Sequence, residues 1–528
     1  MPDSFEVSTI DLVILIAWVI LTRVAALWMV RGKSEDASGF FLGGRNFTWP
    51  LIGFSLFATN MSGASFVGMA GAGYSSGISV YSYEWMAAII LVVFVIFLLP
   101  FYLRSGVFTM PEFLERRYDR RSRYAFAILL VFLSVFLDCA GALYAGGLVL
   151  QTLWPAVPLW VGVLILALLS GVLSITGGLG AVVISDTIQG TVLIIGGVIV
   201  FAAALMAIPS WEAVEAAAPA GSLSIIQPLD DPFLPWPGLF GVLIIGMYFW
   251  ATNQLIVQRA LGAKSLDHGR WGALFAGLLK LPPLFIMVLP GVIAIYLYPD
   301  LPTPDLAFPT LVFDLLPTGL RGIILAALVA AITSTVDSIL NSASTLVTMD
   351  LVRPLRPQTT DMQLVRIGRV VTAVVMLVGI VWAPQIVRFP SLWTYFQSIL
   401  AYATPPVVAI FFMGILWRRA TPAAAFWTFI IGLGVGVTGF VLNEIQGAFE
   451  LHFLYAACAL FGLGLVLMVG ISLMTTSKEG EETDQLIWRT QLWRDETLEL
   501  AGTPVWQNYR YLSVGLLMVT AAIVIWWW

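Results

Sequence analysis

Apolar runs of about 20 residues recur along the whole chain, and each run is long enough to cross about 30 Å of hydrocarbon. Only 11% of the 528 residues are charged, and 59% are hydrophobic. A soluble chain carries about a quarter charged residues, so one large soluble core cannot account for this shortfall. The sequence therefore predicts an all-α membrane protein that crosses the bilayer many times.

The apolar runs predict about fourteen transmembrane helices. Lys and Arg concentrate in cytoplasmic loops, which allows the order of the spans to be checked by charge. Most of the 26 basic residues fall in alternate segments between the predicted spans, and the intervening segments carry acidic residues instead. This alternation predicts a plasma-membrane protein with both termini outside, as in a bacterial inner membrane. The predicted spans are 10–30, 48–70, 82–103, 124–150, 157–176, 180–207, 237–259, 270–298, 315–348, 365–386, 394–417, 421–443, 452–475 and 508–528.

Composition also narrows the classes of function. The formal net charge of −5 provides no general basic surface for nucleic acid. Two histidines exclude a histidine-rich metal site, and two cysteines inside apolar segments show no paired spacing. No metal cluster, nucleophile elbow or phosphate-binding loop is found, so the chain is not expected to be an enzyme. The expected partners are the lipid bilayer and a small solute, without an obligate protein partner.

Residues 476–507 form the one sizeable polar insertion. Within it Ile487, Trp488, Leu492 and Trp493 recur at helical spacing beside basic residues. This pattern predicts a helix that lies at the cytoplasmic interface. A mostly disordered loop is the alternative.

Among the ionisable residues inside the predicted spans five stand out, namely Glu84, Asp138, Asp186, Lys280 and Asp337, and Arg23 also lies within a span. A charge at the centre of the bilayer costs several kcal/mol, so such residues are functional candidates. The structural alternative is that they pair with one another and only hold helices together. Five of them beside hydroxyl-rich stretches favour a polar cavity.

Two of the spans are unusually rich in hydroxyl groups and glycine. Residues 53–73 combine several glycines with polar side chains such as Thr59 and Ser62, which weakens helical order. A helix broken at mid-membrane frees backbone carbonyls, and these suit a hard cation such as Na⁺. Residues 331–345 contain Ser334 and Thr335, whose hydroxyl oxygens would complete a small all-oxygen site. Small hydroxyl residues also serve ordinary helix packing, which is the alternative explanation.

Six segments together carry a resemblance to a known family. They are 41–45 (FLGGR), 55–60 (SLFATN), 83–85 (YEW), 177–189 (GGLGAVVISDTIQ), 253–259 (NQLIVQR) and 341–350 (NSASTLVTMD). In this order they resemble the solute:sodium symporter family, and within it the sodium/glucose cotransporter type. The similarity runs from about residue 38 to 420.

The resemblance implies a leucine-transporter-type fold with two inverted five-helix repeats and alternating access driven by Na⁺ as the coupling ion. No organic cofactor is implied. The repeats would occupy 38–207 and 208–420. The expected flanking parts are an N-terminal helix and loop at 1–37, two peripheral helices at 421–475, the cytoplasmic loop 476–507 and a last helix at 508–528.

The resemblance also implies specific binding residues. The main sodium site would take the carbonyls of Ala58, Met61 and Ala331 with the hydroxyls of Ser334 and Thr335. The sugar site would include Asn60, Glu84, Trp250, Lys280 and Gln397. These residue types suit a sugar, because polar groups can bond several hydroxyls while an aromatic ring covers an apolar sugar face.

Two positions depart from the family pattern. Ser65 stands where sugar-transporting relatives usually have Gln or His, so one sugar contact is shortened. Phe249 stands in place of a tyrosine that stacks on the sugar, with Tyr248 adjacent, so stacking is kept while a hydroxyl is lost or displaced.

A second cation site is a further expectation. Asp186 matches an acidic position that forms an extra Na⁺ site in some relatives, and Asp337 lies one helical turn from Ser334. Two neighbouring carboxylates repel unless a cation lies between them. The candidate site is Asp186, Asp337 and Ser338, giving two Na⁺, or Na⁺ plus H⁺, per solute. In the alternative, Asp337 caps a helix or pairs elsewhere, for instance with a cytoplasmic arginine.

The sequence thus predicts a sodium-coupled symporter that imports a sugar or sugar-like polyol. One alternative is a symporter of the same fold for a carboxylated solute such as sialic acid. That solute would favour an unpaired arginine in the cavity, and none is evident. The other alternative is a solute-gated sensor or leak channel.

Overall fold

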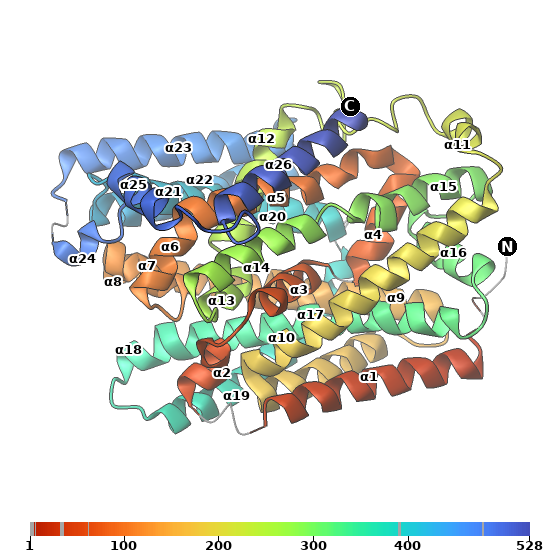
Figure 1. Cartoon of the computed structure of the whole chain (residues 1–528), viewed down its shortest axis with the longest axis horizontal. Helices are drawn as coiled ribbons and strands as arrows, with labels where there is room; N and C mark the ends of the chain where they lie inside the picture. The colour runs from red at the N-terminus through yellow and green to blue at the C-terminus, as the bar shows by residue number, and fades with distance from the viewer. Residues whose placement is uncertain (1–4, 6, 32–35, 62, 389–391, 478–479) are drawn as a thin grey trace.

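The computed structural model describes residues 5, 7–31, 36–61, 63–388, 392–477 and 480–528. Within these residues the regular structure is helical, and two isolated β-bridges are the only strand-like pairings. The prediction of an all-α architecture is confirmed. The long helices lie roughly along one direction (Figure 1).

The helices of the membrane-spanning body are long or occur as consecutive pieces. They are α1 (Thr9–Met29), α3 (Trp49–Asn60), α4 (Gly63–Ser76), α5 (Ser82–Val93), α6 (Leu99–Ser105), α8 (Arg120–Phe132), α9 (Ala140–Leu153), α10 (Leu159–Ala207), α12 (Gly238–Ala251), α13 (Gln254–Leu261), α14 (Leu266–Leu279), α15 (Leu289–Leu297), α17 (Leu320–Leu346), α19 (Asp361–Trp382), α20 (Leu392–Ala403), α21 (Pro405–Leu416), α22 (Pro422–Phe440), α23 (Phe453–Met474) and α26 (Tyr509–Trp526).

Shorter helices lie at the ends of this body. They are α2 (Ala37–Leu42), α7 (Met110–Arg117), α11 (Trp211–Ala217), α16 (Ala307–Leu315), α18 (Arg353–Leu355), α24 (Glu481–Asp484) and α25 (Thr490–Glu499). Helix α25 occupies part of the polar insertion in which an interfacial helix is expected. It begins after Ile487 and Trp488, so only Leu492 and Trp493 of the predicted pattern lie on it.

The described residues contain ten helical segments that are long and apolar enough to cross a membrane, or up to twelve when two bent pairs are each counted as one span. Two segments exceed what one crossing needs. Helix α10 has 49 residues, and at 1.5 Å per residue it would reach about 74 Å if straight, over twice the thickness of the hydrocarbon. The number of fourteen crossings stays a prediction.

Gly178 divides α10 at the place where the sequence predicts a boundary between two spans. Its φ of 60° and ψ of −162° belong to a region open essentially only to glycine. A Cβ at this position would lie 2.5 Å from the carbonyl oxygen of Phe40. The two halves, 159–177 and 179–207, correspond to the predicted spans 157–176 and 180–207.

Two breaks elsewhere interrupt helices inside the body. Helix α3 ends at Asn60, Met61 leaves the helical region at φ −88° and ψ 88°, and α4 begins at Gly63. This is the break that the glycine- and hydroxyl-rich stretch predicts. Helices α12 and α13 meet at an angle of 47°, where the side chain of Asn253 accepts a hydrogen bond from Leu255 N (2.9 Å). The sequence predicts one continuous span there, so this second break was missed.

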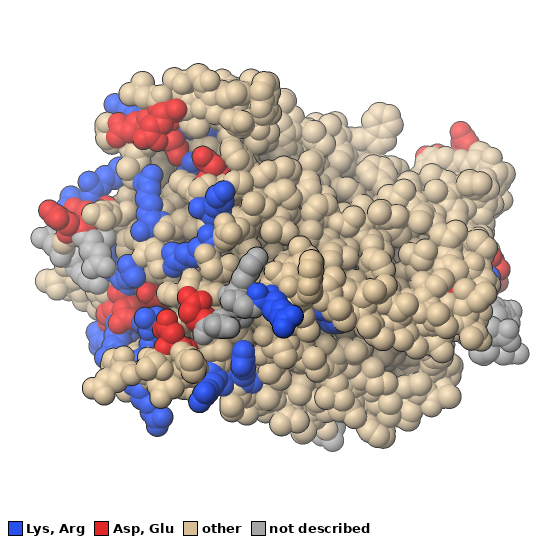
Figure 2. All heavy atoms as spheres, turned by 60° about the horizontal axis from the view of Figure 1, so that its bottom comes forward, with Lys and Arg blue, Asp and Glu red and all other residues tan. Residues whose placement is uncertain are grey.

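Basic side chains gather at one end of the molecule (Figure 2). It is the end at which α2, α7, α18 and α24 lie in Figure 1, while the N-terminus lies at the opposite end. Much of the visible surface between the two ends carries few charges, as a surface facing lipid requires.

Candidate functional site

The first part of the site forms where the end of α3 meets the middle of α17. The last carbonyls of a helix have no partner within that helix, so the end of α3 presents free oxygens. The hydroxyl of Thr335 lies close enough to donate to Thr59 O (3.3 Å) or to Ala331 O of its own helix (3.2 Å). Ala58, Met61 and Ala331 are buried beside it. The structure thus brings hydroxyl and carbonyl oxygens together at a helix end, the chemistry that a small hard cation requires.

Ser334 connects this region to a buried carboxylate. Its Oγ donates to Oδ1 of Asp186 on α10 (2.5 Å). Asp186 is completely buried, and its Oδ2 also accepts from the hydroxyls of Ser55 (2.6 Å) and Thr59 (3.3 Å). The carboxylate therefore orients three hydroxyls from two helices next to the predicted sodium ligands.

Arg259 of α13 neutralises Asp186. Its Nη2 lies 3.3 Å from Oδ2 of Asp186, its Nε donates to Ser55 Oγ (2.7 Å), and Nη2 also contacts Ser338. Both side chains of the pair are fully buried. The predicted span 237–259 places Arg259 at the very end of a crossing, but the bend between α12 and α13 carries this residue into the body, where its side chain is fully buried.

The second part of the site is a polar cluster around Lys280. Its Nζ lies 2.7 Å from Oε2 of Glu84 and contacts the side-chain oxygen of Asn60. The same Nζ lies 5.2 Å from the ring centroid of Trp250, within the range of a cation–π contact. Lys280, Glu84 and Trp250 are buried, whereas Asn60 is half-buried at the end of α3. Four of the predicted substrate residues therefore lie together.

Helix ends explain why these two charges are tolerated. Lys280 caps the C-terminal end of α14, where the partial negative charge of the helix favours a cation. Pro282 and Pro283 follow after Leu281 and prevent the helix from continuing regularly. Glu84 lies in the first turn of α5, where the partial positive charge favours an anion. The pair is thus stabilised from both sides while its groups remain able to bond a solute.

The remaining predicted substrate residues are less closely placed. Phe249 packs edge-to-face on Trp250, with ring centroids 5.5 Å apart and an angle of 80° between the ring planes. Ser65 is half-buried on α4, near the break that follows α3. Gln397 is half-buried on α20, and within the described part of the chain no hydrogen bond joins it to Lys280 or Glu84.

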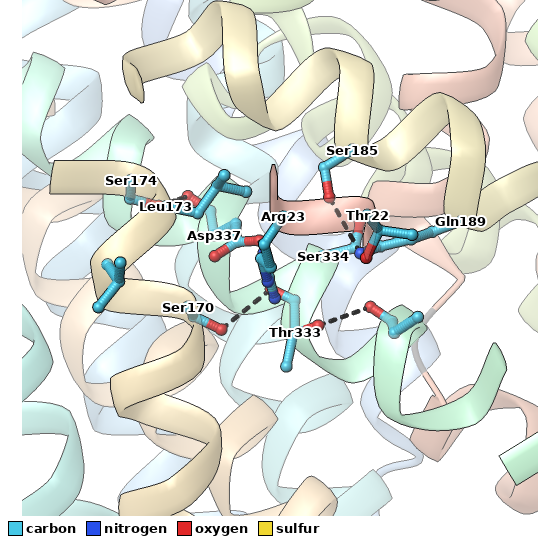
Figure 3. A network of polar contacts seen from close by, with 12 residues as sticks. Thr22, Arg23, Ser170, Leu173, Ser174, Ser185, Gln189, Thr333, Ser334 and Asp337 are labelled. Atoms are coloured by element: carbon cyan, nitrogen blue, oxygen red, sulfur yellow. Dashed lines mark hydrogen bonds and ion pairs between the residues drawn. The ribbon is translucent and has the colours of Figure 1, made fainter. Parts of the chain in front are cut away.

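Asp337, the other predicted cation ligand, pairs with Arg23 of α1 through Oδ2. Its carboxylate is fully buried, and the arginine side chain is 12% exposed. Figure 3 shows this pair among hydroxyl groups of α10 and α17. Of the two alternatives left open by the sequence, the pairing with an arginine is the one seen, but the partner comes from a membrane-spanning helix and not from a cytoplasmic loop. Asp138 lies on the π-helical stretch Leu133–Cys139 and is half-buried.

Sequence reasoning missed three contributors, namely Ser55, Arg23 and Arg259. The signals for Arg23 and Arg259 were present, since one lies inside an apolar run and the other ends a motif (NQLIVQR). Their partners could not be identified, because Arg23 is 314 positions from Asp337 and Arg259 is 73 positions from Asp186.

Comparison with known sequences identifies relatives over most of the chain. Residues 40–432 match the Sodium:solute symporter family. The chain is 34% identical to the sodium/myo-inositol cotransporter 2 of Bos taurus, over 91% of this chain and 79% of that protein. It is 32% identical to the sodium/glucose cotransporter 1 of Oryctolagus cuniculus, over 93% of this chain and 82% of that protein. These relatives are cotransporters, and the chain is a transporter and not an enzyme.

Solved structures share the fold. A Na⁺-coupled sialic acid symporter in a substrate-bound outward-open state superposes with a TM-score of 0.79, covering 90% of this chain and 100% of the symporter at 20% identity. Mhp1, a nucleobase-cation-symport-1 family transporter, gives a TM-score of 0.56 over 86% of this chain and 98% of its own, at 16% identity. The predicted leucine-transporter-type fold is confirmed. With the family match extending over most of its length, this chain belongs to the Sodium:solute symporter family.

Proposed function

We propose that this protein is a secondary active symporter that imports a sugar or a sugar-like polyol together with Na⁺. The observation that carries this proposal is the buried cluster of Lys280, Glu84 and Asn60 against Trp250. A polyhydroxylated solute offers several donors and acceptors on a compact ring, and these three side chains supply both kinds of partner. Trp250 and Phe249 offer an aromatic surface for the apolar face of such a ring.

The cluster also fits a neutral solute better than an anion. Lys280 is already paired with Glu84, so the cluster has no net positive charge with which to hold a carboxylate. The named relatives, a myo-inositol and a glucose cotransporter, support the same substrate class. Ser65 and Gln397 complete the proposed substrate residues.

The proposed sodium site lies next to the cluster, at the same end of α3. Asn60 is the last residue of α3, and the proposed ligands Ala58 and Met61 flank it. Ala331, Ser334 and Thr335 would complete the site from α17. Sodium bound there would fix the end of α3 against α17, and the orientation of Asn60 with it. This geometry couples the ion to the solute because both depend on the same break in α3.

The proposal includes two inverted repeats, 38–207 and 208–420, that rock about the two sites. The basic end of the molecule would face the cytoplasm of a plasma membrane, in agreement with the bias of Lys and Arg toward cytoplasmic loops. This orientation places both termini outside.

A binding screen tests the substrate class. The purified protein should be stabilised against heating by myo-inositol or D-glucose in NaCl, and much less in KCl. The matched variant Lys280→Ala should lose the response to the sugar while keeping the response to Na⁺. Stabilisation by sialic acid alone, with no response to any neutral sugar or polyol, would reject the proposed substrate class.

A further inference from the structure

Helix α1 lies outside both proposed repeats, and yet its residue Arg23 carries a positive charge into the interior of the helical body. It precedes both repeats and packs against α10 and α17. Its buried residues, Asp11, Val19, Thr22 and Ala26, form one narrow face. Much of the rest of the helix is exposed, as expected of a helix that faces lipid at the edge of the bundle.

Arg23 lies on the flank of this narrow face and turns inward. It is six residues from the end of α1 at Met29, or about 9 Å along the axis. An arginine at that depth can extend along the helix to reach the polar interface. The side chain instead contacts the fully buried carboxylate of Asp337 on α17. The position of Arg23 is therefore set by that carboxylate.

The charges around the predicted cation sites balance without any bound ion. Asp186 is paired with Arg259, and Asp337 is paired with Arg23. Asp337 lies three residues beyond Ser334, the hydroxyl that Asp186 holds. One Na⁺ at the main site already adds a positive charge to this balanced set, and a second free cation beside these pairs would add a further uncompensated buried charge, which is costly in a protein interior.

The pair is not built as a simple structural clamp. Nε and Nη2 of Arg23 and Oδ1 of Asp337 are buried without a hydrogen-bond partner among the described residues. Ser170 of α10 faces the pair, and its hydroxyl lies between Thr333 O (3.1 Å) and the Asp337 carboxylate. A buried ion pair with unsatisfied groups contributes little net stability, because desolvation offsets the attraction between the charges. The charge of Arg23 compensates the carboxylate of Asp337.

We propose that the guanidinium group of Arg23 is a tethered cation that takes the place of a second coupling sodium. The inference rests on the proposed sodium-coupled function and determines its ion number. With Arg23 in position, one Na⁺ binds at the main site and one charge crosses with each solute. Without it, the carboxylates of Asp337 and Asp186 and the hydroxyls beside them form an all-oxygen site with excess negative charge, which a second Na⁺ fills.

The test counts bound sodium with radioactive Na⁺ alone, at pH 8.5 and without any solute. The wild type should bind one Na⁺ per chain. Arg23→Met and Arg23→Gln remove the tethered charge by different side chains, and each should bind two. Arg23→Lys keeps a tethered cation and should bind one. The double variant Arg23→Met with Asp337→Asn removes both charges and should also return to one.

Each outcome separates this inference from the proposed function. A wild type that binds two Na⁺ overturns the inference whatever the variants do. A single Na⁺ in both Arg23→Met and Arg23→Gln, with the main site still occupied as proof of folding, overturns it as well. If neither variant folds, the reversal potential of the wild type in proteoliposomes decides, where two charges per solute contradict the inference. A wild type that binds no Na⁺ rejects sodium coupling itself.

Discussion

At the scale of single residues, Thr335 links the two helices on which the proposed sodium site depends. Its hydroxyl lies 3.3 Å from Thr59 O on α3 and 3.2 Å from Ala331 O on α17. A bound Na⁺ would compete for these carbonyls and take the hydroxyl oxygen as a ligand in turn. The residue therefore offers a direct test of where the ion binds.

Removing a hydroxyl ligand should weaken sodium binding. Ser334→Ala and Thr335→Ala are each expected to raise the Na⁺ concentration for half-maximal uptake by about tenfold or more, since a bond to a charged group contributes about 1.5–3 kcal/mol. Thr335→Ser keeps the oxygen and should stay close to the wild type. Ser344→Ala is a matched control, because Ser344 is buried on the same helix but bonds to Gly368 O (2.7 Å). Unchanged sodium dependence in both alanine variants would reject the site.

The Glu84–Lys280 pair should act on the solute and not on the ion. Glu84→Gln and Lys280→Ala each leave a buried polar partner unsatisfied, which costs about 1–3 kcal/mol, or about five- to over a hundredfold in affinity. Equilibrium binding of the solute found in the screen should weaken by that factor, while Na⁺ binding changes less. Wild-type affinity for the solute in both variants would mean that the pair only holds helices together.

The sequence predicts which residues belong to the candidate site, because their chemical types are unusual in a membrane span. It does not predict which residues they pair with. Intramembrane charge alone indicates Glu84, Asp186, Lys280 and Asp337, because lipid penalises each of them. The family resemblance adds Asn60 and Trp250, which the structure places beside Lys280. The two arginine partners were missed because pairing over long sequence separations depends on how helices pack.

At the scale of helices, the breaks position the site. The break after Asn60 exposes carbonyls, the bend between α12 and α13 carries Arg259 inward, and Lys280 lies where α14 ends. Glycine and hydroxyl residues in the sequence predict the break after Asn60, and Pro282 with Pro283 predict the end of α14. The bend at 252–253 is marked only by the short polar run Thr252, Asn253 and Gln254, in which Asn253 caps the start of α13. Hydropathy averaged over a whole span does not resolve so short a run, so a continuous helix is predicted there.

The break at Gly178 should be sensitive to any side chain. Gly178→Ala would place a Cβ 2.5 Å from the carbonyl oxygen of Phe40, in a backbone region that alanine rarely adopts. The conformational cost alone is about 1–3 kcal/mol. We expect a clear fall in melting temperature in detergent. Gly434→Ala is the matched control, because nothing lies within 4 Å of its added Cβ. Equal melting temperatures for the two variants would contradict the assignment of this break.

At the scale of the whole molecule, the two proposed sites share one broken helix, in a chain of the Sodium:solute symporter family. The sodium gradient can drive uptake of the solute only if the ion site and the solute site open and close at the same time during transport. One charge crossing about 100 mV releases about 2.3 kcal/mol. A tenfold sodium gradient adds about 1.4 kcal/mol. Together they support accumulation of the solute by several hundred-fold.

Accumulation of labelled solute in proteoliposomes tests this coupling most directly. With a tenfold inward Na⁺ gradient and an inside-negative potential near 100 mV, labelled myo-inositol or D-glucose, whichever the screen selects, should rise far above its external concentration. Replacement of Na⁺ by K⁺ should abolish the rise. If the internal concentration never exceeds the external one while the solute still evokes a current, the protein is a gated leak or sensor, and the symporter account is wrong.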